Sequence, residues 1–146
     1  MNLGSYLVVV GAGISLVMQQ VLNANLRGQI GSPWWAGAIN YLCGALVMLT
    51  MTAAFGEPWL TKDVVARVPW YSWLGGLFGA IFIGSAIFMV PRLGAATVVA
   101  LFVVGQMFGS LAFDHFGFLG VPQHDANPVR LAGAACLILG VVLIRY

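Results

Sequence analysis

The sequence contains very little charge. Only 7% of its 146 residues are Asp, Glu, Lys or Arg, whereas soluble domains carry about 25%. Hydrophobic residues make up 61% of the chain, and the mean hydropathy is +0.97. A water-facing surface cannot be built from this composition, so it excludes a soluble domain and predicts an integral membrane protein.

Signatures of catalysis, metal binding and nucleic-acid binding are also absent from the sequence. We find no glycine-rich phosphate loop before a lysine, no nucleophile elbow and no zinc-ligand spacing. His115, His124 and Asp125 are too loosely spaced to predict a metal site. Cys43 and Cys136 fall inside predicted spans, where we expect packing residues rather than a disulfide. The six basic residues form no patch. We therefore expect no enzyme, no cofactor, no metal and no nucleic-acid partner.

Long uncharged windows predict an all-α membrane protein, with residues 1–146 forming one domain of five transmembrane helices. The apolar runs are continuous and lack the alternation of barrel strands. Four of them reach the roughly 20 residues that cross about 30 Å of hydrocarbon. The fifth has a charge-free stretch of only about 21 Å, but Arg130 and Arg145 can extend their charges to the interfaces; a buried core helix is the alternative. The predicted spans are 3–26, 35–55, 70–90, 93–113 and 129–144.

Short connections separate these spans, and none of them could hold a further domain. All six prolines lie at or next to a connection, so we expect prolines to punctuate the spans without interrupting them. No Lys or Arg precedes Leu3 and no cleavage site follows it, so we expect the first segment to remain as a helix. The predicted connections are 28–34, 56–69, 91–94 and 114–128.

The basic residues are divided evenly between the two sides of the predicted bundle. The count of Lys and Arg normally sets membrane orientation, and an even count predicts insertion both ways round. Two inverted copies would form an antiparallel homodimer, a ten-helix bundle with the inverted symmetry common among transporters. The alternative is that the N-terminal amine or loop length decides orientation. The two sides carry Lys62, Arg67 and Arg130 against Arg27, Arg92 and Arg145.

Small residues recur at four-residue spacing and predict close helix packing, since lipid supplies no hydrophobic drive between helices. The pairs are Gly75 with Gly79 and Gly105 with Gly109. The last span carries a similar stripe of Ala132, Cys136 and Gly140. Each pair could pack within one chain or between two copies in the dimer.

Polar residues inside the spans are candidates for a substrate pathway, because each is costly in hydrocarbon and tends to face a cavity or another helix. Two stripes lie on single helix faces, and Asn40 adds a polar group to the second span. We predict a pathway for a neutral or zwitterionic polar solute; hydrogen bonds that only join the helices are the alternative. The pathway candidates are Gln19, Asn23, Asn40 and Gln106, with Ser15 and Ser110 on the same stripes, and weaker candidates are Gln20 and Asn25.

Asp114 is the only acidic residue at a helix end on a polar stripe. No Asp, Glu, Lys, Arg or His lies deep in any predicted span, so proton coupling has no other evident carrier. The position of Asp114 at the membrane interface also fits a structural anchor. We therefore expect either a coupling residue or an anchor at this position.

The stretch Gly94-Ala95-Ala96-Thr97 through Gln106 to Asp114, with Asn40 four residues before Gly44 and the segment 19–23, resembles the YdcZ-type family of the drug/metabolite transporter superfamily. The resemblance covers nearly the whole chain. It implies five helices, a bacterial inner membrane location and a transporter of undefined substrate. It also implies single dual-topology proteins, oppositely oriented pairs or fused ten-helix forms.

The chain departs from the related small multidrug exporters, whose first helix carries a membrane-embedded glutamate. Here that helix has Gln19 and Gln20 and no acid, so exchange of a cation for protons by that mechanism is not expected. The sequence predicts a transporter half that moves a small polar or amphipathic solute by alternating access as an antiparallel homodimer. A passive channel and a non-transporting accessory subunit are the alternatives.

Overall fold

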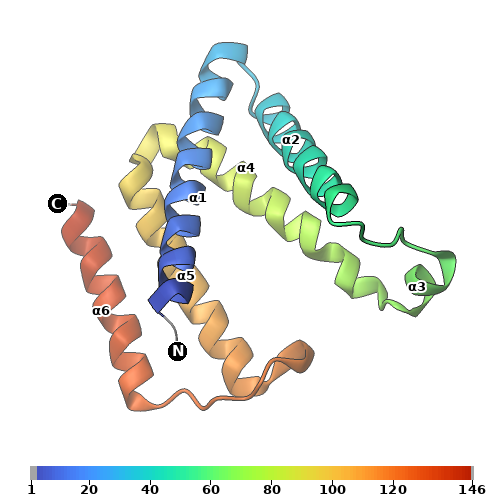
Figure 1. The fold of residues 1–146 in the computed structure, drawn as a ribbon. Helices are drawn as coiled ribbons and strands as arrows, with labels where there is room; N and C mark the ends of the chain where they lie inside the picture. The colour runs from blue at the N-terminus through green and yellow to red at the C-terminus, as the bar shows by residue number, and fades with distance from the viewer. Residues whose placement is uncertain (1–2, 146) are drawn as a thin grey trace. The chain divides into compact units, whose positions relative to one another are not determined.

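The computed structural model describes residues 3–145, and regular structure within that range is helical throughout (Figure 1). Four segments are long and apolar enough to cross a membrane: α1, α2, η1 with α4, and α5. The prediction of an all-helical membrane protein is therefore confirmed. The elements are α1 (Leu3–Ile30), α2 (Pro33–Ala54), α3 (Lys62–Arg67), η1 (Trp70–Leu74), α4 (Gly75–Leu93), α5 (Ala95–Phe116), η2 (Phe118–Gly120) and α6 (Pro128–Arg145).

The turn between α1 and α2 is only two residues long. Gly31 ends α1 at a φ of 72°, a left-handed conformation that glycine adopts without a Cβ penalty. The Ser32 hydroxyl accepts a hydrogen bond from the Trp35 amide, and Pro33 occupies the first position of α2. The residues that end α1 and begin α2 all lie after residue 26, the predicted end of the first span. Helix α1 therefore continues four residues past that position and includes Arg27.

Helix α4 contains Pro91, so the expectation that no proline interrupts a span is wrong. The helix continues to Leu93, and Gly94 alone separates it from α5. Proline lacks the amide proton that would bond to the carbonyl four residues earlier, which is that of Ile87. The Arg27 side chain donates a hydrogen bond to this carbonyl at 2.8 Å. The lost backbone bond is thus replaced from another helix, which allows α4 to extend past the proline.

The chain divides into two compact units, the first ending at Arg92 and the second beginning at Leu93. In the first unit Ala36 of α2 packs with Ile83 and Ile87 of α4, and all three are at most 5% exposed. Leu26 of α1 and Phe82 of α4 lie against this cluster. Three helices of the first unit therefore meet at one apolar core.

The second unit is a hairpin of α5 and α6. Gly117 ends α5 in the left-handed conformation, and its amide donates to the Phe113 carbonyl. Asn127 starts α6 as its side-chain oxygen accepts a hydrogen bond from the Arg130 amide at 2.9 Å, with Pro128 at the first helical position. The 18 residues of α6 give a length of about 27 Å.

Candidate functional site

A groove of about 600 Å³ runs between α1 and α2 in the first unit. Four of the six predicted pathway residues line it: Ser15, Gln19 and Asn23 from α1, and Asn40 from α2. The rest of the lining is apolar or small, and comprises Gly11, Ile14, Met18, Leu22, Leu26, Ile39 and Cys43. The four-residue spacing of the α1 stripe is what brings its members onto the face that meets α2.

Three amide side chains meet inside this groove. The Asn40 side-chain oxygen accepts one hydrogen bond from Gln19 Nε2 at 3.0 Å and another from Asn23 Nδ2 at 3.1 Å. Asn23 is only 6% exposed, and the other two are partly buried. A single acceptor on α2 therefore joins two successive turns of α1 and fixes the orientation of all three amides.

The hydrogen-bonding geometry leaves each amide with capacity to bind a further group. Because the Asn40 oxygen faces the two α1 donors, its own NH₂ group is directed away from them. The carbonyl oxygens of Gln19 and Asn23 are acceptors that the two bonds do not use. No Asp, Glu, Lys, Arg or His is among the lining residues. The groove thus offers donors and acceptors in an apolar setting without a formal charge.

The remaining predicted pathway residues, Gln106 and Ser110, lie on α5 in the second unit. The groove in the first unit is therefore built from α1 and α2 alone. Of the weaker candidates, Asn25 bonds with Gln29 one turn along the exposed side of α1. Gln20 is different, since it is 1% exposed and its side-chain oxygen has no hydrogen-bond partner among the described residues. Nothing in the sequence indicates that Gln20, and not its neighbour Gln19, would be the fully buried glutamine.

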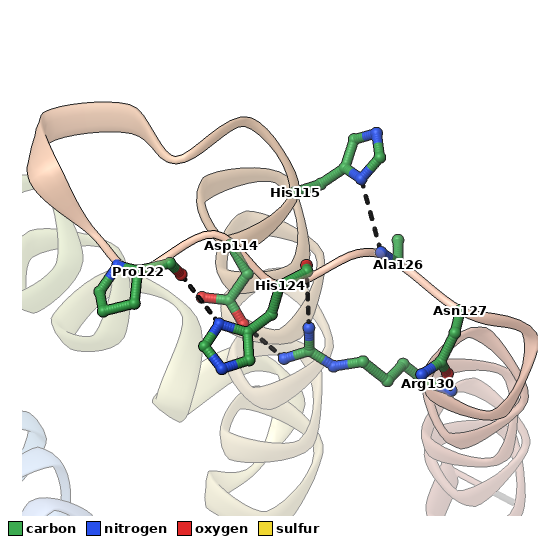
Figure 2. Close-up of polar contacts among 7 residues, drawn as sticks. All are labelled: Asp114, His115, Pro122, His124, Ala126, Asn127 and Arg130. Carbon is green, nitrogen blue, oxygen red and sulfur yellow. Dashed lines mark hydrogen bonds and ion pairs between the residues drawn. The ribbon is translucent and has the colours of Figure 1, made fainter.

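Asp114 ends the polar stripe on α5, and its carboxylate forms an ion pair with Arg130 in the first turn of α6 (Figure 2). The two side chains are 25% and 35% exposed. Arg130 also donates to the His124 carbonyl at 3.3 Å, so it contacts both the helix end and the connecting loop. This pair joins the two helices of the hairpin at the end where the loop leaves them.

The connection between α5 and α6 folds back over the end of α5. The His124 amide donates to the Asp114 carbonyl at 2.8 Å, and Gln123 Nε2 donates to the His115 carbonyl at 2.8 Å. These carbonyls lie in the last turn of α5, where no helical amide remains to pair with them. His115 and Asp125 approach to 3.8 Å, but no cluster of three possible metal ligands occurs among residues 3–145. These two hydrogen bonds hold the loop against the C-terminal end of α5.

The glycines predicted to mediate packing differ in their surroundings. A Cβ built on Gly79 would lie 2.9 Å from the hydroxyl of Tyr41, so the end of this α2 side chain occupies the space that the glycine of α4 leaves open. Gly75 has no atom of its own unit within 4 Å of such a position, and neither has Gly105 or Gly109 on α5. Of these four glycines, only Gly79 is packed against a side chain of its own unit.

Comparison with known proteins assigns nearly the whole chain to one family. The sequence pattern of the family described as "Putative inner membrane exporter, YdcZ" matches residues 5–143. The inner membrane protein YdcZ of Escherichia coli (strain K12) is 30% identical over 143 residues, which cover 93% of this chain and 91% of that protein. No solved structure matches the chain.

Proposed function

The chain belongs to the YdcZ family, and from that membership we propose that it is a multi-pass transporter of the bacterial inner membrane rather than an enzyme. The observation that supports a transport role most directly is the amide cluster in the groove between α1 and α2. Polar groups inside membrane helices are costly and are usually found where they face a cavity or one another. Here Gln19, Asn23 and Asn40 do both.

The solute that suits this groove is small, polar and without net charge. The unused amide donors and acceptors can pair with hydroxyl, amide, carbonyl or zwitterionic groups. A bare ion would meet no opposite charge among the lining residues. An apolar wall that includes Ile14, Leu22 and Ile39 would accommodate a solute that also has a hydrocarbon part.

We further propose that α6 is a fifth span and that two chains pair in opposite orientations. The length of α6, about 27 Å, comes close to the hydrocarbon thickness. Arg130, in the first turn of α6, pairs with Asp114 at the end of α5, and this charged end suits a membrane interface. The even count of basic residues supports insertion both ways round. In such a dimer Gly105 and Gly109 would be available for contact between copies, because no atom of their own unit fills the space beside them.

Alternating access follows as the mechanism of this dimer. One protomer would rock against its inverted partner, with the solute held near the midplane by the amide grooves and by Gln106 and Ser110 of α5. Asp114 acts as an anchor in this proposal, because its carboxylate is already paired with Arg130. A passive channel and an accessory subunit are the competing functions; a channel would also use amides that line a groove, whereas an accessory subunit would not need them.

A solute screen on the purified protein tests this proposal. Thermal shifts in detergent would be recorded against a panel of neutral, zwitterionic, cationic and anionic small solutes, and the best would then be measured as a radiolabelled substrate in proteoliposomes. We expect saturable flux of a neutral or zwitterionic solute, with large losses on changing Gln19, Asn23, Asn40 or Gln106 to Ala. Full activity in all four variants would rule out the proposed lining, and flux that never saturates would favour a channel.

A further inference from the structure

The first unit has a second groove, the α4 groove, which shares no residue with the groove that holds the amide cluster. It is lined by Trp34 of α2 and by residues of α4 between Ala80 and Met89, and its volume is about 660 Å³. Only Trp34 and Ser85 among the lining residues can donate a hydrogen bond from a side chain. The α4 groove therefore suits a hydrocarbon chain better than a polar solute.

The α4 groove is about as long as one membrane leaflet is deep. From Ala80 to Met89 the helix rises about 13 Å at roughly 1.5 Å per residue, and half of the hydrocarbon thickness is about 15 Å. Gly84 leaves the groove open, because a Cβ built there meets no atom within 4 Å. Trp34, exposed at the start of α2, marks the end of the groove that lies at the membrane interface. An acyl chain that enters beside Trp34 would reach the bilayer midplane near Ala80.

An arginine without an acidic partner borders the interfacial end of this groove. The Arg27 Cζ atom lies 5.1 Å from the ring centre of Phe88, which lines the groove and contacts Trp34 edge-on. The hydrogen bond to the Ile87 carbonyl uses one of the five N–H donors of the guanidinium. Neither of the two ion pairs within residues 3–145 includes Arg27. A positive charge with further donors therefore lies beside an apolar groove.

The charges of the first unit differ between its two ends. Arg27 and Arg92 lie in the last turns of α1 and α4, at the end where Trp34 meets Phe88. The acidic residues before Leu93 are Glu57 and Asp63, and both lie in the connection at the other end.

The interfacial end of the α4 groove is thus positive and carries no carboxylate. The anion that a bilayer supplies at this depth is the phosphate of a lipid headgroup, which an arginine can bind through two donors.

We propose that the α4 groove binds one anionic phospholipid, with its phosphate at Arg27 and one acyl chain along α4 from Met89 to Ala80. Arg92 adds a second positive charge near the headgroup, and the absence of acid at this end favours an anionic lipid over a zwitterionic one. The site requires only that the chain lies in a membrane. It is therefore independent of the proposed transport activity and of pairing between copies.

Native mass spectrometry of the purified protein in detergent tests this site. The protein would be titrated with phosphatidylglycerol and with phosphatidylcholine of the same acyl chains, and inorganic phosphate would be added as a competitor. We expect the first phosphatidylglycerol to bind about fivefold more tightly than the first phosphatidylcholine. Inorganic phosphate at the same concentration should displace neither lipid, because it has no acyl chain to occupy the groove.

Two substitutions separate the headgroup contact from the acyl-chain contact. Arg27→Gln removes the charge and keeps an amide that can donate to the Ile87 carbonyl, so the preference for phosphatidylglycerol should disappear. Gly84→Leu fills the groove, so both lipids should bind more weakly. The matched controls are Arg67→Gln, at the other end of the unit, and Gly76→Leu, on α4 outside the groove. Both controls should bind the two lipids as the unaltered protein does.

Several results would overturn the proposal. Equal affinity for the two lipids, or an undiminished preference in Arg27→Gln, would show that the arginine does not select the headgroup. Displacement of phosphatidylglycerol by inorganic phosphate would indicate a site for free anions. Lipid bound to monomers but not to dimers would show that a second copy covers the groove. If Arg27→Gln does not fold, equal binding of phosphatidylglycerol by Gly84→Leu and Gly76→Leu would still refute the groove as the site.

Discussion

Replacing Asn40 with Ala should destabilise the protein by removing one acceptor that two donors share. Gln19 and Asn23 both donate to the Asn40 oxygen, at 3.0 and 3.1 Å. Hydrogen bonds between membrane helices contribute about 0.6 kcal/mol on average and up to about 1.7 kcal/mol. Two such bonds give about 1–2 kcal/mol, and the upper end is expected because the variant leaves the buried Asn23 donor without its partner.

The free energy of unfolding would be measured in mixed micelles by titration with a denaturing detergent, where about 1–2 kcal/mol corresponds to roughly 5- to 30-fold in the unfolding equilibrium. Thr50→Ala is the control in the same helix, since the Thr50 hydroxyl bonds only to the Leu46 carbonyl one turn earlier, and its loss should change stability by no more than about 0.5 kcal/mol. An Asn40→Ala protein as stable as the Thr50→Ala protein would refute the shared-acceptor reasoning.

Three further predictions concern other contacts. Asp114→Ala and Arg130→Ala should each lower the free energy of unfolding by about 1 kcal/mol or less, because the ion pair is partly exposed. In a double-mutant cycle, the double variant should lose little more stability than either single variant. Gly79→Ala should lower the thermal midpoint because its Cβ would lie 2.9 Å from the Tyr41 hydroxyl. Adding Tyr41→Phe should reverse most of this loss, whereas additive losses from the two substitutions would contradict the contact. Asn127→Ala should cost about 1 kcal/mol by removing the cap of α6, and no change in denaturant midpoint would argue against that cap.

The helical membrane fold could be predicted from the sequence because charge and hydropathy alone impose it. Long charge-free windows predict membrane spans, and because these windows lack the alternation of barrel strands, helices are the remaining way to pair the backbone polar groups in lipid. The end of α1 was harder to place, since the helix passes through Arg27 and stops at the Gly31 turn. A charged residue at a membrane boundary does not by itself end a helix. Local stop signals decide the boundary instead.

Part of the candidate site could also be predicted. Four-residue spacing on one helix face indicated that Gln19 and Asn23 lie together, and the structure places Asn40 between them. The bond from Arg27 to Ile87 could not be foreseen, because it joins residues 60 positions apart and replaces a donor whose loss depends on Pro91 lying inside a helix. The roles of these polar groups in transport remain predictions.

The central claim is that two inverted copies of this chain form one transporter, and its most direct test is a crosslinking and topology measurement in native membranes. Single-cysteine variants would be labelled from each side of the membrane, with Cys43 and Cys136 changed to Ser, and then crosslinked. We predict that each reporter position is labelled from both sides and that oppositely oriented copies crosslink to each other. A single orientation for every reporter would contradict the antiparallel homodimer.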